Sequence, residues 1–165
     1  MKPLELIFKP YLENGKFPNE WKKANVVPVH KRNNKQLIEN YRPISLLPVC
    51  GKILERLIYN KMFEFFTENE LISQNQSGFK PGDSCISQLL CITHDIYQSL
   101  DDGLETRAVF LDISKAFDKV WHKGLLFKLK LNGISGNLLN VITDFLYQRK
   151  QRVVLSGQHS SWTNV

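Results

Sequence analysis

AVFLDISKAFDKV, residues 108–120, is the most informative stretch of this chain. Its apolar run, residues 109–111, ends in a carboxylate, Asp112, and a second carboxylate, Asp118, directly follows the aromatic Phe117. Continuous apolar runs are typical of buried strands, and α/β folds expose their chemistry where such strands end. A carboxylate there needs a cation or hydrogen bonds, which indicates a hard-metal ligand such as one for Mg²⁺. A solvated Asp112 that caps the next turn is the alternative that these residues leave open.

Asp118 has a structural interpretation instead. Phosphoryl-transfer sites commonly hold two divalent ions about 4 Å apart, between carboxylates that come from at least two strands. The sequence offers one clear strand-end carboxylate, Asp112, and Asp118 lies too far along the chain to be its neighbour on the same strand. We therefore predict that Asp118 caps or pins the following turn.

Composition indicates a globular domain with a basic surface. The 165 residues suffice for one domain with a core, and a hydrophobic content of 42% excludes a disordered chain. The formal net charge of +6 is compatible with a phosphate-rich partner, although many basic domains bind no nucleic acid.

Membrane, secreted and zinc-binding proteins are not indicated. No run approaches the roughly 20 apolar residues of a membrane span, and the N-terminal segment lacks the apolar core of a secretory signal. We therefore expect an intracellular chain, in the nucleus or the cytoplasm. The three cysteines are odd in number and lack metal-ligand spacing, which predicts free thiols, and the four histidines are scattered.

Hydrophobic periodicity and turn residues predict an alternation of helices and short strands. Helices are expected over residues 3–12, 51–68, 123–131 and 137–147, and over a segment that Asp83 can cap and that stops at Gly103. Strands are expected over residues 25–31, 41–47, 109–111, 152–155 and 161–165. The first two should form a hairpin, in which Pro28 indicates an edge or irregular position, and the last two a hairpin that turns at 156–157. Helices segregate from strands, which predicts an α+β fold.

Two further clusters could carry chemistry. Lys31, Arg32, Lys35 and Arg42 lie on or beside the first predicted hairpin, where they could bind phosphates or simply form a solvated, edge-protecting face. The loop SGFKPG, residues 77–82, places Lys80 between glycines that allow close backbone approach, but it lacks the ending of a P-loop. A plain turn before a helix would explain that loop equally well.

Taken in order, these pieces resemble the reverse transcriptase of non-LTR (LINE-type) retrotransposons, from about residue 15 to residue 165. The resemblance is carried by FPNEWKKANVVPVHK, NYRPISLLPVCGKILERLI, QSGFKPGDSCISQLL and AVFLDISKAFDKVWH, with LLFKLKLNGISGNLLNVITDFLYQRKQRVVL after them. Four such motifs in the family's order are specific, whereas a single one would not be.

The resemblance implies a right-hand polymerase fold, with fingers over residues 1–103 and the start of the palm over residues 104–165. It implies that Asp112, helped by the backbone carbonyl of Ile113, binds two catalytic Mg²⁺ ions, and that Phe117 is the steric gate below the sugar of the incoming nucleotide. Asp118 stays structural. The resemblance also implies that Lys31 and Arg42 bind the triphosphate of that nucleotide. The residues that it places near the nucleotide and the template strand are Gln76, Gly78, Phe79 and Lys80.

The chain also departs from the family pattern. The family often has Arg where Lys80 and Asp83 stand, and its Gly-x-Pro-Gln-Gly segment and its aromatic-x-Asp-Asp hairpin do not occur in these residues. The chain therefore resembles the front half of a polymerase domain, and we expect the isolated chain not to polymerise.

Three functions remain open at this point. The first is part of an RNA-directed DNA polymerase that adds dNTPs to a DNA primer on an RNA template. The second is a non-catalytic nucleic-acid-binding remnant, whose binding should weaken with salt. The third is a basic α+β domain with an unrelated structural role.

Overall fold

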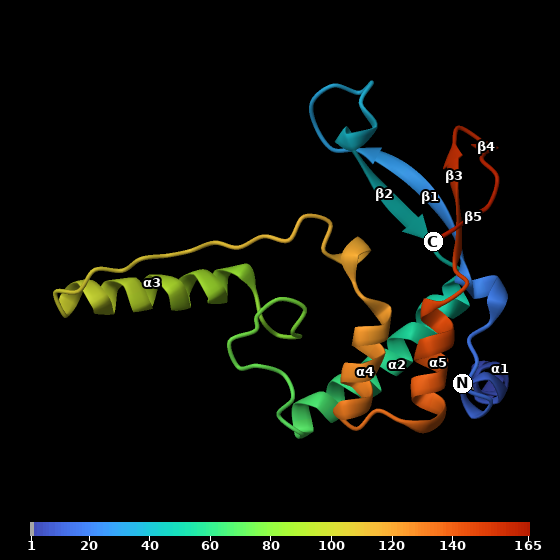
Figure 1. The fold of residues 1–165 in the computed structure, drawn as a ribbon, viewed down its shortest axis with the longest axis horizontal. Coiled ribbons are helices and arrows are strands. Elements are labelled where there is room, and N and C mark those ends of the chain that lie inside the picture. The colour runs from blue at the N-terminus through green and yellow to red at the C-terminus, as the bar shows by residue number, and fades with distance from the viewer. Residues whose placement is uncertain (1) are drawn as a thin grey trace. The chain divides into compact units, whose positions relative to one another are not determined.

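A computed structural model describes residues 2–165, and its elements confirm the predicted α+β class (Figure 1). The chain divides into two compact units. The first runs to Met62 and resumes over Trp121–Val165, and the second is Phe63–Val120. The helices are α1 (Lys2–Glu13), α2 (Val49–Glu68), α3 (Cys85–Asp101), α4 (His122–Leu131) and α5 (Gly136–Leu146), with short 3₁₀ turns η1 (Asn19–Lys22), η2 (Ile38–Asn40) and η3 (Phe117–Lys119).

A mixed sheet in the first unit has the strand order β2-β1-β3-β4, and β5 also pairs with β3. Its strands are β1 (Lys23–His30), β2 (Tyr41–Leu46), β3 (Lys150–Leu155), β4 (Gln158–His159) and β5 (Thr163–Asn164). The predicted hairpin of β1 and β2 is confirmed. The parallel pairing of β1 with β3 was not predicted, because it joins two segments that are far apart in the chain and are not connected by a turn. The turn at Ser156–Gly157 is also confirmed, but the strand that returns from it is split into β4 and β5.

Pro28 shows why β1 can contain a proline although it lies between two strands. β1 pairs with β3 only over residues 23–26, so Pro28 has a strand beside it on the β2 side alone among the described residues. Because proline has no N–H to donate, it fits a position where no donor is required. The expected edge position is therefore correct for the end of β1 and wrong for its beginning.

The core of the first unit lies where α1, α2 and α5 meet. It consists of Phe8, Phe17, Leu54 and Val141. The ring of Trp21 packs edge-on against Phe8 and Phe17, with centroids 5.8 and 6.1 Å apart. Gly15 ends α1 with a φ of +63°, and a Cβ there would lie 2.7 Å from the Cβ of Asn140 in α5, so this turn requires glycine.

A buried ion pair ties the segment after α1 to α5. The side chain of Lys22 is 2% exposed, and its Nζ lies 2.8 Å from Oδ2 of Asp144. The same oxygen accepts a hydrogen bond from the backbone N–H of Phe17 at 2.8 Å. Burial raises the pKa of Asp144, but the hydrogen bonds from Lys22 and Phe17 and the charges of Lys22 and Lys16 lower it further, and the net shift is downward.

In the second unit, the residue that caps the beginning of α3 is one position later than expected. Oγ of Ser84, not the predicted Asp83, accepts the hydrogen bond from the N–H of Ser87 that caps the helix, at 3.1 Å. The carboxylate of Asp83 instead accepts from the N–H of Ser84 at 2.7 Å. The predicted apolar face of α3 is exposed, which includes Ile86, Leu89, Leu90 and Leu100.

The predicted strand over residues 109–111 is wrong. The chain from Leu104 to Ile113 forms no helix or strand, and Val109, Phe110 and Leu111 are 83–91% exposed. A strand exists through the hydrogen bonds that it exchanges with a neighbour, and no strand among the described residues lies alongside this segment. The apolar pattern correctly encodes a preference for burial, but burial requires a partner that local sequence does not supply.

We expect Asp144→Asn to destabilise the first unit by about 3 kcal/mol at pH 7, because Lys22 is then left buried without its counter-charge. Since the folded-state pKa of Asp144 lies below its ordinary value of 3.8, its stabilisation is complete above that ordinary value and is lost as the pH falls through the lowered pKa. Urea unfolding of both proteins at pH 7 and pH 3 should therefore give a smaller difference at the lower pH.

Lys16→Ala is the matched control for this variant. The Lys16 ammonium lies 3.9 Å from Oδ1 of the same carboxylate, but its side chain is 69% exposed. We expect its loss to change stability by about 0.5 kcal/mol or less. Equal destabilisation by Asp144→Asn and Lys16→Ala would contradict a special role for the buried pair.

Candidate functional site

The predicted site residues fall into both compact units, so each group is described by itself. Lys31 and Arg42 belong to the first unit. The second unit holds the others: Gln76, Gly78, Phe79, Lys80, Asp112, Ile113, Phe117 and Asp118.

The register of the β1–β2 hairpin puts Lys31 and Arg42 on one face. Arg42 pairs with Val29, and the N–H of Lys31 continues the ladder by donating to the carbonyl of Asn40 at 2.8 Å. Because side chains alternate along a strand, Val29 and Lys31 share a face, and the partner of Val29 shares it too. Both cations are exposed, and neither forms an ion pair with any residue from 2 to 165.

Local contacts hold the loop that joins these strands. The hydroxyl of Tyr41 donates to the carbonyl of Lys35 at 2.8 Å, and the rings of Tyr41 and His30 pack edge-on at 5.3 Å. Nε2 of His30 lies 3.1 Å from the carbonyl oxygen of Asn33, a residue with a φ of +67°. The loop between Lys31 and Arg42 is therefore held by internal hydrogen bonds rather than being a free tether.

In the second unit, the structure brings two predicted site residues together. The rings of Phe79 and Phe117 pack edge-on with centroids 5.9 Å apart, although they belong to separate motifs. Next to Phe79, Nε2 of Gln76 donates to the carbonyl of Gly78 at 3.1 Å, which orders the loop that also carries the exposed Lys80. Sequence spacing contains no signal for the ring contact.

Asp112 and Ile113 lie in the exposed segment that was expected to be a strand. In the part of the chain that the structure describes, no group of three or more His, Cys, Asp or Glu side chains could hold a metal ion. The Asp112 carboxylate and the Ile113 carbonyl are oxygen donors of the kind Mg²⁺ prefers, but two donors do not complete its coordination. The residues described therefore do not fit a whole magnesium site.

Asp118 lies inside the short turn η3, together with Phe117. Its backbone N–H donates to the carbonyl of Lys115 at 3.1 Å. Ala116 is the cap residue of η3 and makes no side-chain cap hydrogen bond, and the expected cap from the Asp118 side chain is not found among residues 2–165. The structural role of Asp118 stays a prediction.

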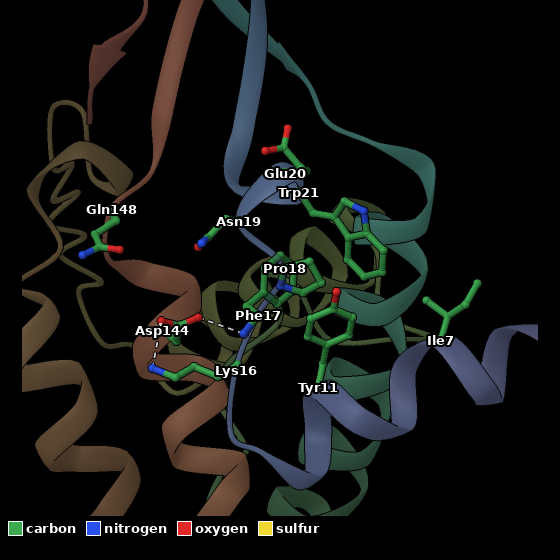
Figure 2. A pocket seen from close by; sticks show the side chains of 10 residues that line it. All are labelled: Ile7, Tyr11, Lys16, Phe17, Pro18, Asn19, Glu20, Trp21, Asp144 and Gln148. Atoms are coloured by element: carbon green, nitrogen blue, oxygen red, sulfur yellow. Dashed lines mark hydrogen bonds and ion pairs between the residues drawn. The ribbon is translucent and has the colours of Figure 1, made fainter.

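A groove of about 600 Å³ in the first unit was not predicted from the sequence (Figure 2). We call it the aromatic groove. Its apolar end carries Tyr11 and Trp21, and its polar end carries Asn19 and Gln148 beside the Lys16–Asp144 contact. The aromatic and proline residues around FPNEW were the only hint of this groove in the sequence. The groove is completed by Asp144 in α5, more than a hundred residues further along the chain, which no local pattern indicates.

No described helix reaches the combined length and apolar character that crossing a membrane requires.

Comparison with known proteins identifies the family. The family model described as reverse transcriptase (RNA-dependent DNA polymerase) matches residues 29–165. The probable RNA-directed DNA polymerase from transposon BS of Drosophila melanogaster is 41% identical over 128 residues, which are 77% of this chain and 14% of that protein. The RNA-directed DNA polymerase from mobile element jockey of the same species is 36% identical over 159 residues, 96% of this chain and 17% of that protein.

The chain thus spans less than a fifth of the length of these relatives. The family match nevertheless covers most of its own residues, including the β1–β2 hairpin from Val29 onward and the segment around Asp112. The chain therefore belongs to the reverse transcriptase (RNA-dependent DNA polymerase) family, as its resemblance to LINE-type retrotransposon enzymes predicted.

Proposed function

We infer that this chain is part of an RNA-directed DNA polymerase of a non-LTR retrotransposon, with fingers over residues 1–103 and the start of the palm over residues 104–165. The family match over residues 29–165 carries the inference, together with relatives whose names state this activity. The partners of the complete enzyme are then an RNA template, a DNA primer and dNTPs.

Lys31 and Arg42 are assigned to the triphosphate of the incoming nucleotide. Their common face on the β1–β2 hairpin supports this role, because two cations from adjacent strands can contact one polyphosphate. Arg can contact two oxygens at once, whereas Lys acts as a point charge. Their lack of carboxylate partners among the described residues leaves both charges available to an anion.

Asp112 and the carbonyl of Ile113 are assigned as ligands of Mg²⁺. The family match and the oxygen chemistry of these donors support the assignment. The facing carboxylates of a two-ion site are not among the described residues, so Asp112 is one ligand of a set that this part of the enzyme does not complete.

Phe117 is assigned as the steric gate that excludes a 2′-hydroxyl. Gln76, Gly78, Phe79 and Lys80 are assigned to the vicinity of the nucleotide and template. The edge-on contact of Phe79 with Phe117 supports a common location for these two residues within the second unit.

A non-catalytic nucleic-acid-binding remnant is the second candidate function. The net charge of +6 is compatible with it. The two candidates share phosphate binding and differ in whether Asp112 contributes to DNA synthesis.

We expect the double variant Lys31→Ala/Arg42→Ala to bind an RNA–DNA primer–template at least about tenfold more weakly than the unchanged chain at 50 mM salt, because two phosphate contacts are lost. The slope of log affinity against log salt concentration should fall by about 2. Fluorescence anisotropy of a labelled primer measures both quantities.

Lys128→Ala/Lys130→Ala, in α4, is the charge-matched control and removes the same charge from exposed positions. We expect it to bind within about twofold of the unchanged chain. Equal losses in the two double variants would mean that only net charge matters, which would contradict a specific role for Lys31 and Arg42.

Asp112 can be tested in a hybrid in which residues 29–165 replace the matching segment of the jockey polymerase. We expect the hybrid to extend a DNA primer on an RNA template with Mg²⁺, and Asp112→Ala to lower the initial rate at least about a hundredfold, because a metal ligand is lost. Asp101→Ala, at the exposed end of α3, is the control and should retain the rate within about twofold. Extension that survives Asp112→Ala would refute the metal-ligand assignment.

A further inference from the structure

We propose that the aromatic groove binds unpaired bases of the single-stranded RNA template, a partner that rests on the proposed polymerase function. The groove belongs to the first unit and contains neither Lys31 nor Arg42. It therefore supplies a second contact with nucleic acid besides the nucleotide-binding residues proposed above.

The apolar end of the groove is a prepared stacking surface. The rings of Tyr11 and Trp21 lie 6.0 Å apart at an interplanar angle of 50°. The buried rings of Phe8 and Phe17 pack edge-on against Trp21 and fix its orientation. Tyr11 remains 37% exposed. Aromatic rings held in this way bind unpaired bases by stacking, with little dependence on which base is present.

The polar end matches the edges of bases. The side chains of Asn19 and Gln148 approach the groove from η1 and from the segment between α5 and β3 (Figure 2). Each carboxamide offers both donors and an acceptor, which is the combination that pairs with the edge of an unpaired base. Bases inside a duplex have these edges occupied, so the groove fits a single strand.

A second hollow continues from this polar end. It has a volume of about 530 Å³ and shares Asn19, Glu20 and Gln148 with the aromatic groove. Its other lining includes Arg149 and Lys150. The two hollows together therefore carry aromatic rings at one end, amides in the middle and basic side chains at the other end. In a single-stranded nucleic acid, the bases can stack on the rings and bind the amides, and the phosphates can contact the basic side chains.

The carboxylates beside this track are already compensated. Both oxygens of Glu20 lie 2.9 Å from Nζ of Lys23, and Asp144 is paired with the buried Lys22. The exposed Lys150 adds positive charge at the far end, where the guanidinium of Arg149 stacks on Phe145, so the track favours an anionic ligand. A proline-rich peptide could also stack on Tyr11 and Trp21, but it would leave the exposed ammonium of Lys150 without an anionic partner.

Trp21 itself reports on occupancy of the groove. In the full 165-residue chain carrying Trp121→Phe and Trp162→Phe, Trp21 is the remaining tryptophan. We expect a twelve-nucleotide oligo(rA) to quench its fluorescence saturably, and Tyr11→Ala to weaken this binding about tenfold through the loss of one stacking partner. Tyr97→Ala, on the exposed face of α3, should bind within twofold.

The outcomes separate this inference from the proposed function. If oligo(rA) does not quench Trp21 while primer–template binding still depends on Lys31 and Arg42, the proposed role of the groove is wrong and the proposed function is unaffected. Loss of both kinds of binding would overturn the proposed function as well. Oligo(dA) that binds more than about tenfold tighter than oligo(rA), or decaproline that binds tighter than either, would overturn the assignment to RNA.

A second measurement uses the unsubstituted chain and so does not depend on the folding of any variant. A twelve-nucleotide RNA containing 4-thiouridine is cross-linked to the chain, and the attached peptides are identified by mass spectrometry. We expect cross-links within residues 11–21 or 148–150. Cross-links confined to residues 63–120 would overturn the proposal.

Discussion

The buried contact between Lys22 and Asp144 is the constraint on which the first unit depends. A charged ammonium that is 2% exposed is tolerated only beside its counter-charge, so α5 must lie against the segment that follows α1. The same carboxylate binds the N–H of Phe17, a residue 127 positions away along the chain. One side chain thus fixes the core residue Phe17, the turn η1 and the start of β1.

This constraint also prepares the surfaces on which function is proposed. η1 leads directly into β1, and the parallel pairing of β1 with β3 aligns Lys23 with Lys150. The antiparallel pairing of β1 with β2 then puts Lys31 and Arg42 on one face of the hairpin. The aromatic groove is lined by Asp144 of this ion pair and by Phe17, the residue whose N–H the same carboxylate binds. Stability and the proposed ligand contacts therefore depend on the same packing.

The second unit is organised by different means. α3 has a capped beginning and an exposed apolar face, and the segment with Asp112 is extended and exposed. Many of its large apolar side chains face water, so local hydrogen bonds and ring contacts such as that of Phe79 with Phe117 define this unit. The chemistry proposed for Asp112 requires further ligands, and no metal-binding cluster is found among residues 2–165.

Local sequence determined the helices, the β1–β2 hairpin, the turn at Ser156–Gly157 and, through its ordered motifs, membership of the reverse transcriptase family. Those features depend on periodicity, turn residues and motif order, all of which are properties of neighbouring residues. Tertiary structure alone decided that β1 pairs with β3, that Lys22 is buried against Asp144, that α5 completes the aromatic groove and that residues 109–111 form no strand. Each of these outcomes depends on whether a distant segment supplies a partner, and the pattern of one segment does not contain that information.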